Sequence, residues 1–126
     1  EVGRVLLAER SDKWGWVPPG GGVEDGETFA NAAIRETFEE IGLLFSNEDL
    51  RLLGVYPTKG KTGGPALTVA FRAKVKPTHK VIAWAKSHEI SCVRWVTREE
   101  AEKLSIPFSL ESAVRDHFEN QELAAR

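Results

Sequence analysis

The strongest constraint on the fold is the segment 28–41, whose pattern predicts a single amphipathic helix. Thr28 is a residue type that caps helix N-termini, and Gly42 is one that ends helices in a left-handed backbone conformation. Apolar side chains recur between them every three or four residues, at Ala30, Ile34, Phe38 and Ile41. Because residues at that spacing share one side of a helix, we expect this side to pack against the rest of the chain.

The same segment gathers three carboxylates, Glu36, Glu39 and Glu40, on one face, roughly opposite the apolar stripe. Like charges at these spacings repel and destabilise an isolated helix. Two interpretations are open: the glutamates form a solvated acidic surface, or they hold a cation. Carboxylate oxygens are hard ligands, so Mg²⁺ or Mn²⁺ is the cation that such a face would be expected to bind.

Composition is that of an ordinary globular domain. The chain has 126 residues, 41% of them hydrophobic and 29% charged, with a formal net charge of -2, which suits one domain over residues 1–126. It contains no methionine, so the natural N-terminus is expected to lie upstream of Glu1. The small charge predicts no general attraction to nucleic acid polymers or membranes, and no apolar run could span a bilayer. A lone cysteine, Cys92, excludes an internal disulfide and fits a cytoplasmic location.

The rest of the chain alternates strand and helix patterns. Strands are expected where β-branched and apolar residues gather, over residues 2–8, 50–56, 66–75 and 90–96. Thr97 followed by Glu100 is a capping-box pattern that opens a short helix, and Ser109 is expected to cap a final helix. This order predicts an α/β fold in which helices cover both faces of a mixed β-sheet.

The helix and the loop before it share a pattern of fixed positions. These positions are Gly21, Glu27, Arg35, Glu36, Glu39, Glu40, Gly42 and Leu43. In this arrangement the segment resembles the Nudix box, GX5EX7REUXEEXGU, in which U is an apolar residue. Thr37 departs from the pattern at the first U position, although its methyl group can still pack. Looser similarity extends the resemblance over most of the chain.

The resemblance implies a Nudix-type α/β/α sandwich and a hydrolase. The substrate would be a nucleoside di- or triphosphate, or a nucleoside diphosphate linked to another moiety, cleaved at a phosphoanhydride with Mg²⁺ or Mn²⁺ as cofactor. The implied metal ligands are the carboxylates of Glu36, Glu39 and Glu40 and the backbone carbonyl of Gly20. The same three glutamates are therefore candidate catalytic residues.

Further catalytic roles follow from the same resemblance. Arg35 is implied to pair with Glu27 and so to hold the loop to the helix; an exposed ion pair of little energetic effect is the alternative. The general base could be Glu36 or Glu39, and the sequence does not distinguish them. Glu89 stands just before an Arg-Trp-Val strand, where many relatives place an acidic metal ligand or general base. A solvated loop carboxylate is the alternative for Glu89.

Substrate-binding residues are expected outside the box, and four residues are candidates. Trp14 could stack on a base or other ring, or it could anchor its loop by partial burial. Tyr56, at the expected end of a strand, has the same two possibilities. Lys59, in a glycine-rich turn, could contact phosphates or remain solvated, and Arg10 could reach the phosphates or brace the box.

Two other classes of protein share parts of this pattern. A Nudix-like module could sense a nucleotide without hydrolysing it, but such regulators commonly lose box carboxylates, and this chain keeps all of them. A generic cation-binding acidic helix would not require the glycine, proline and arginine positions. We therefore expect a monomeric or homodimeric enzyme with a small-molecule substrate, and the sequence leaves open which pyrophosphate it cleaves.

Overall fold

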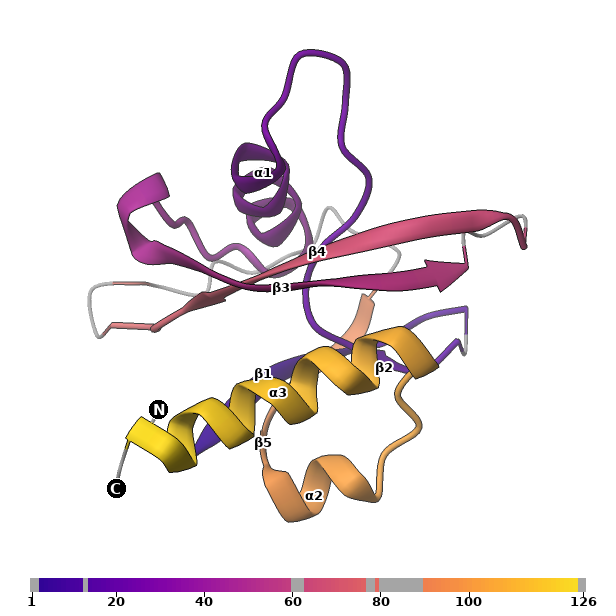
Figure 1. The fold of residues 1–126 in the computed structure, drawn as a ribbon, viewed down its shortest axis with the longest axis vertical. Coiled ribbons are helices and arrows are strands. Elements are labelled where there is room, and N and C mark those ends of the chain that lie inside the picture. Colours follow the sequence, from indigo (N-terminus) through magenta and orange to yellow (C-terminus); the bar gives the residue numbers. More distant parts are fainter. Residues whose placement is uncertain (1–2, 13, 60–62, 77–78, 80–89, 125–126) are drawn as a thin grey trace.

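Strands and helices alternate along the chain in the computed structural model, which describes residues 3–12, 14–59, 63–76, 79 and 90–124. The elements are β1 (Arg4–Arg10), β2 (Trp16–Val17), α1 (Phe29–Ile41), η1 (Asn47–Asp49), β3 (Leu50–Lys59), β4 (Pro65–Ala73), β5 (Ile90–Thr97), α2 (Arg98–Glu102) and α3 (Phe108–Ala124). Figure 1 shows their arrangement in space.

The strands form two antiparallel sheets in the described part of the chain. In the first sheet, β1 pairs with β5 along its length and with β2 at Ala8 and Glu9; in the second, β3 and β4 form a hairpin. The expected α/β class is confirmed, although these strands do not join in one mixed sheet. β2 stops after two residues because Pro18 and Pro19 follow it, and proline has no N–H to donate to a ladder.

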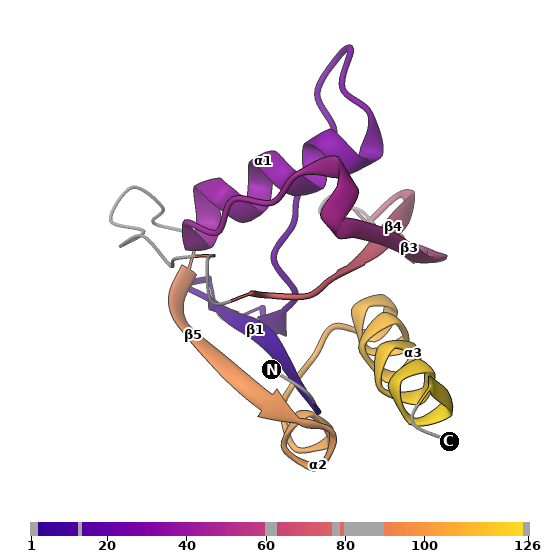
Figure 2. The same cartoon turned by 90° about the vertical axis from the view of Figure 1, so that its left-hand side faces the viewer.

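Helices α1 and α3 lie on opposite sides of the β3–β4 hairpin, as the two ribbon views show (Figure 1, Figure 2). α3 contacts mainly β3, whereas α1 meets β4 and η1. The sheet of β1, β2 and β5 lies on the α3 side of the hairpin, and α2 follows β5 at the end farthest from α1. The prediction that helices cover both sides of the strands is therefore confirmed.

The core cluster is buried between the first sheet and the helices α2 and α3. Its members are Leu7, Val96, Ala101, Val114 and Phe118, none of them more than 7% exposed. They come from β1, β5, α2 and α3. Among the described residues, α1 contributes nothing to this cluster.

Helix α1 begins and ends where the sequence predicts. Thr28 Oγ1 accepts the backbone N–H of Asn31 at 3.0 Å, so Thr28 is the N-cap. Gly42 has a φ of 72°, and its N–H donates to the carbonyl of Phe38. This left-handed glycine closes the helix without the steric cost that a side chain would bring.

Helix α1 does not bury the predicted apolar stripe. Ile41 is 1% exposed, but Phe38 is 44% exposed, and Glu40, expected on the opposite face, is buried at 3% exposure. The cause is the loop before the helix, which folds over the acidic side through Gly20. Both flanks of α1 are thus partly covered, and within the predicted stripe Ala30 and Ile34 are half-buried while Phe38 is exposed.

Several element boundaries differ from the prediction, and two of the differences involve residues that the sequence analysis singled out. β3 does not end at Tyr56, because its pairing with β4 continues as far as Lys59 opposite Pro65. α3 begins at Phe108, so Ser109 lies in its first turn. Within the described residues, no helix is both long and apolar enough to cross a membrane.

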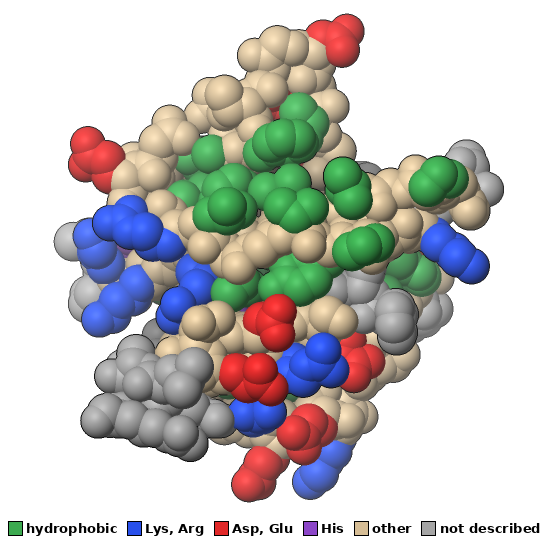
Figure 3. Space-filling view, viewed as in Figure 1, with side chains coloured by type: hydrophobic (Ala, Val, Ile, Leu, Met, Phe, Trp, Pro, Cys, Tyr) green, Lys and Arg blue, Asp and Glu red, His purple; other side chains and the backbone are tan. Residues whose placement is uncertain are grey.

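One face of the molecule divides into an apolar half and a charged half. Figure 3 shows hydrophobic side chains gathered over the hairpin and α1, and charged side chains of both signs over α3. The large apolar residues left exposed on α1, β3 and β4 are Phe29, Phe38, Leu52, Val55 and Leu67.

Candidate functional site

The loop that precedes α1 folds into a turn that positions Glu27. The backbone N–H of Glu27 donates to the Glu24 carbonyl at 3.0 Å, and the Glu24 N–H donates to Glu27 Oε1 at 2.8 Å. Gly26 has a φ of 81°, a left-handed conformation that glycine adopts without steric cost. The turn fixes the Glu27 carboxylate beside the helix, within reach of Arg35.

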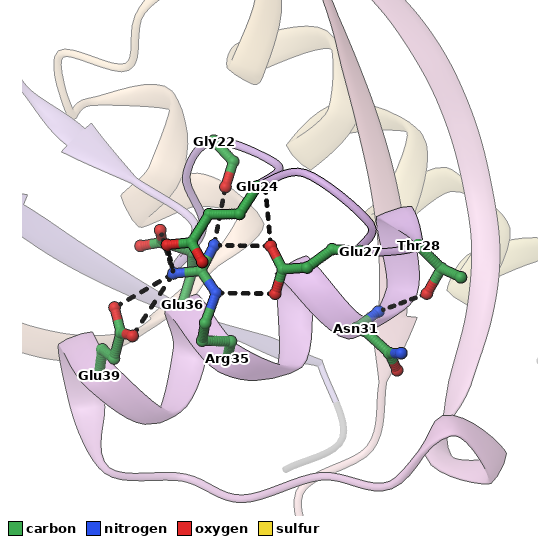
Figure 4. A network of polar contacts seen from close by, with 8 residues as sticks. All are labelled: Gly22, Glu24, Glu27, Thr28, Asn31, Arg35, Glu36 and Glu39. Atoms are coloured by element: carbon green, nitrogen blue, oxygen red, sulfur yellow. Dashed lines mark hydrogen bonds and ion pairs between the residues drawn. The ribbon is translucent and has the colours of Figure 1, made fainter.

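Arg35 joins this turn to the helix through a two-pronged ion pair (Figure 4). Its Nε donates to Glu27 Oε2 at 2.8 Å, its Nη2 donates to Oε1 at 3.0 Å, and Nη2 also donates to the carbonyl of Gly22 at 2.9 Å. The expected Arg35–Glu27 pair is therefore present. The hydrogen bond from Arg35, helped by the Glu24 N–H, lowers the pKa of the Glu27 carboxyl. Glu27 and Glu36 in turn raise the pKa of Arg35.

The third nitrogen of the guanidinium points toward other carboxylates. Nη1 donates to Glu36 Oε1 at 2.9 Å and lies 3.3 Å from Glu39 Oε2, one turn farther along the helix, as Figure 4 shows. It also lies 3.6 Å from Glu24 Oε1. One cationic group thus stands among the carboxylates of α1 and its loop and offsets the repulsion between them.

Glu40 has a different environment. Its side chain is buried, and Oε1 accepts the Gly20 N–H at 2.8 Å, which fastens the glycine loop to α1. In the part of the chain that the structure describes, no three Asp, Glu, His or Cys side chains converge as metal ligands. The assignment of Glu36, Glu39 and Glu40 as metal ligands therefore stays a prediction. In this arrangement Arg35 bonds Glu36 and Glu39, whereas the Gly20 N–H bonds Glu40.

The residues nevertheless fit a divalent cation. Glu36 and Glu39 direct carboxylate oxygens at one cationic nitrogen, and such oxygens are the donors that Mg²⁺ and Mn²⁺ prefer. Gly21 leaves room for the Glu36 carboxylate, because a Cβ at position 21 would lie 2.5 Å from the Glu36 Cδ. This close approach accounts for glycine at that position of the motif.

Three of the four candidate substrate-binding residues line one cleft of about 980 Å³. Arg10, Trp14 and Lys59 lie along it. Gly21 lines the same cleft and also contacts Glu36. The cleft therefore adjoins the Arg35 network through this glycine.

Arg10 and Trp14 are held together by Asp12, a residue that sequence analysis missed. Asp12 accepts Nε and Nη2 of Arg10 at 3.2 and 2.8 Å, and it accepts the backbone N–H of Trp14 at 3.0 Å. The Arg10 guanidinium lies 5.5 Å from the centre of the Trp14 ring, and Trp14 is 51% exposed. The signal available in the sequence is the spacing, since a short acidic side chain readily bonds groups two residues away.

Tyr56 is not among the described residues that line this cleft. Tyr56 donates its hydroxyl to Asp116 Oδ2 of α3 at 2.7 Å, and burial raises the pKa of Tyr56 to about 12. The expectation that Tyr56 ends a strand beside the pocket is wrong, because β3 continues to Lys59 and turns Tyr56 toward α3. Glu89 lies outside the described residues.

Comparison with known proteins places the chain in a family. The family model of the NUDIX domain matches residues 1–116, so the chain belongs to the NUDIX family. The RNA pyrophosphohydrolase of Serratia proteamaculans is 47% identical over 51 residues, which cover 40% of this chain and 28% of that protein. The RNA pyrophosphohydrolase of Baumannia cicadellinicola is 35% identical over 82 residues, which cover 65% of this chain and 42% of that protein. This chain thus spans less than half the length of either curated relative.

Solved structures share the fold. The crystal structure of C. elegans Ap4A hydrolase superposes with a TM-score of 0.67 at 28% sequence identity, covering 90% of this chain and 83% of that chain.

Proposed function

We propose that this chain is a divalent-metal-dependent hydrolase of phosphoanhydride bonds in nucleotides or related organic pyrophosphates. The observation that carries the proposal is the Arg35 network, in which one guanidinium joins Glu27 of the loop to Glu36 and Glu39 of the helix. Membership of the NUDIX family and the names of the relatives support the same activity.

The proposed metal site takes oxygen ligands only. Its candidates are the carboxylates of Glu36, Glu39, Glu40 and Glu89 and the carbonyl of Gly20. A bound Mg²⁺ or Mn²⁺ would polarise phosphoryl oxygens, offset the charge of the polyanionic substrate and lower the pKa of a bound water to about 7 in favourable sites.

The chain's own residues position that site. Arg35 and Glu27 hold the glycine loop against α1, and the buried Glu40 holds the N–H of Gly20. Glu39 has a side chain 55% exposed, so it is accessible from solvent, whereas Glu36 is 17% exposed. Glu36 and Glu39 are the candidates for the general base among the described residues.

The cleft beside Gly21 is the proposed substrate site. Trp14 offers an exposed ring on which a base can stack, and Asp12 fixes Arg10 next to it. Arg10 and Lys59 supply positive charge for phosphates. This combination of an aromatic face and two cations favours a nucleotide over a simple inorganic pyrophosphate.

A substrate panel assayed with Mg²⁺ and with Mn²⁺ tests the proposal. It should contain nucleoside di- and triphosphates, ADP-ribose, dinucleoside tetraphosphate, thiamine pyrophosphate and an RNA oligonucleotide with a 5′-triphosphate. We expect release of phosphate, pyrophosphate or a nucleoside monophosphate from at least one class, abolished by EDTA. No turnover with any class, together with tight nucleotide binding, would instead support a nucleotide-sensing module.

A pair of charge-matched variants makes the test specific. Glu40→Gln keeps the size of the side chain and an oxygen that can accept the Gly20 N–H, but it removes a candidate ligand charge. We expect it to lose most metal-dependent turnover while remaining folded. Glu111→Gln, on the exposed surface of α3, is the control and should behave like the unmodified chain. Near-normal turnover by Glu40→Gln at saturating Mg²⁺ would contradict the assignment.

A further inference from the structure

We propose that a divalent ion and the Nη1 nitrogen of Arg35 compete for the carboxylates of Glu36 and Glu39. Binding of the ion then releases this one nitrogen, while the rest of the guanidinium stays on Glu27. The inference rests on the proposed metal-dependent function and concerns how the same site is regulated. Arg35 becomes a positioning residue that also sets the ion concentration at which the site fills.

The nitrogens of the Arg35 guanidinium are divided between the loop before α1 and the helix itself. Nε and Nη2 donate to the two oxygens of Glu27 at 2.8 and 3.0 Å, and Nη2 also donates to the Gly22 carbonyl at 2.9 Å. These three bonds tie Arg35 to the loop. Nη1 donates instead to Glu36 at 2.9 Å and to Glu39 at 3.3 and 3.4 Å, both on the helix. One half of the group can therefore change partner while the other half keeps its own.

The weakest hydrogen bond of the guanidinium is the one with Glu39 on the helix. The contacts of Nη1 with Glu39 are longer than any contact of the loop half, and the Glu39 side chain is 55% exposed. The Glu27 side chain is 19% exposed and is further fixed by the Glu24 N–H. Because hydrogen bonds weaken with distance and exposed ion pairs contribute little, the Nη1–Glu39 contact should open first. The Nη1–Glu36 bond, at 2.9 Å, is the one that an ion must displace directly.

It is electrostatically unfavourable for a divalent ion and Nη1 of Arg35 to bind the carboxylates of Glu36 and Glu39 at the same time. An ion bound by Glu36 and Glu39 would lie within a few ångströms of Nη1, and two cations at that separation repel strongly in a partly desolvated site. The carboxylate oxygens that Nη1 uses are also those that an ion would need. Arg35 thus serves as an internal counter-ion for the acidic face, which a stronger cation replaces.

Nuclear magnetic resonance of the unmodified chain tests the displacement directly. The arginine side-chain signals would be followed while EDTA-treated protein is titrated with Mg²⁺, with binding measured in parallel by calorimetry. We expect rotation of the Arg35 Nη1 group to accelerate as Mg²⁺ binds, while the Nε–H signal stays in its hydrogen-bonded position. Unchanged Nη1 signals at saturating Mg²⁺, or simultaneous release of both halves, would overturn the proposal.

Two variants give an independent measure of the competition. Arg35→Gln and Glu27→Gln both break the loop pair, but only the first removes the competing cation. If Arg35 competes, Mn²⁺ should bind Arg35→Gln about two- to fivefold more tightly than Glu27→Gln by electron paramagnetic resonance, a factor typical of weak ion pairs. Equal affinities, or weaker binding by Arg35→Gln, would show that Arg35 only supports the loop. If either variant fails to fold, the titration of the unmodified chain decides.

The two proposals fail in different ways. Hydrolysis without movement of Nη1 would support the proposed function and contradict the proposed competition. Movement of Nη1 on addition of Mg²⁺, with no substrate hydrolysed, would support the proposed competition and contradict the proposed enzymatic function. Absence of any Mg²⁺ binding would contradict both proposals.

Discussion

The two helices that flank the β3–β4 hairpin are attached to the molecule in different ways. α3 inserts Val114 and Phe118 into the core cluster, where they meet β1 and β5. α1 has no member of that cluster in the described part of the chain; it buries Ala32 and Ile41 elsewhere. Arg35 and Glu40 tie α1 to the loop before it. Apolar packing depends on buried area, whereas hydrogen bonds and ion pairs depend on distance and angle. Stability should therefore reside mainly on the α3 side, and chemistry on the α1 side.

The largest expected effect is on the α3 side. Phe118→Ala would remove an aromatic ring that is 4% exposed and leave a cavity in the core cluster. We expect the free energy of unfolding to fall by about 3–5 kcal/mol, as is typical of buried Phe→Ala changes. Urea unfolding followed by circular dichroism measures this loss.

A phenylalanine on the α1 side provides the control for that measurement. Phe29 is 58% exposed, so Phe29→Ala should change the free energy of unfolding by no more than about 0.5 kcal/mol. Similar losses for the two variants would mean that α1 is as strongly packed as α3, and the comparison between the helices would fail.

The next effect is on catalysis rather than on stability. Gly21→Ala would bring a Cβ to 2.5 Å from the Glu36 Cδ, so the carboxylate must move. Since a displacement of about 1 Å in a catalytic group can lower the rate about 100-fold, we expect kcat to fall by about that factor with little change in stability. Steady-state kinetics on the substrate identified by the panel measures this change.

The neighbouring glycine is the matched control. A Cβ at Gly22 would meet nothing within 4 Å, and its carbonyl would remain available to Arg35. Gly22→Ala should therefore lose far less activity than Gly21→Ala. Equal losses at the two positions would indicate that the loop conformation, and not the position of Glu36, limits the reaction.

The ends of α1 and the ion pair to its loop could be predicted from the sequence, whereas the burial of Glu40 could not. The Thr28 cap and the Gly42 stop follow from spacings around one helix, and the Arg35–Glu27 pair follows from the resemblance to the Nudix box. The burial of Glu40 depends on where the loop returns, because the Gly20 N–H needs an acceptor beneath it. Helical periodicity alone places Glu40 on a solvated face and therefore misses this role.

A smaller effect is expected where a polar contact supports the α3 side. Tyr56→Phe would remove the hydroxyl that donates to Asp116 at 2.7 Å and would keep the ring. We expect a loss of about 1 kcal/mol in the free energy of unfolding, typical of one hydrogen bond. Urea unfolding measures it, and kcat should be unchanged, since Tyr56 lies away from the cleft. A large fall in kcat would restore Tyr56 as a substrate-binding candidate.

The exposure of side chains along β3 also escaped prediction. The register of β3 shifts between Leu52 and Gly54, so residues on either side of the irregularity do not follow one alternation. Leu52 is consequently 63% exposed, although Tyr56, four residues later, faces α3. Period-two reasoning would place both side chains on one face. Gly54, at the edge of the irregularity, is the local signal for it, because a glycine inside a strand often marks a bulge.

The smallest expected effect is a pH dependence at the same α3 interface. His117 Nδ1 accepts Arg72 Nε at 3.2 Å, which requires that nitrogen to be unprotonated. Burial, together with the charge of Arg72, lowers the pKa of His117 below its ordinary value of 6.5. The unfolded chain therefore binds this proton more readily than the folded one. The free energy of unfolding should be highest above pH 6.5 and fall as the pH drops below it.

Comparison with His117→Asn isolates this contribution. The Oδ1 of asparagine can accept the Arg72 N–H in place of Nδ1 but does not titrate in this range. Melting temperatures measured from pH 7.5 to 5.5 should fall more for the unmodified chain than for the variant, because every other ionisable group is common to both. Parallel pH profiles would mean that His117 is protonated equally in the folded and unfolded chain. The stability of the α3 side would then be independent of the charge on His117. Its contrast with the α1 side, which is held by charged groups, would be sharper.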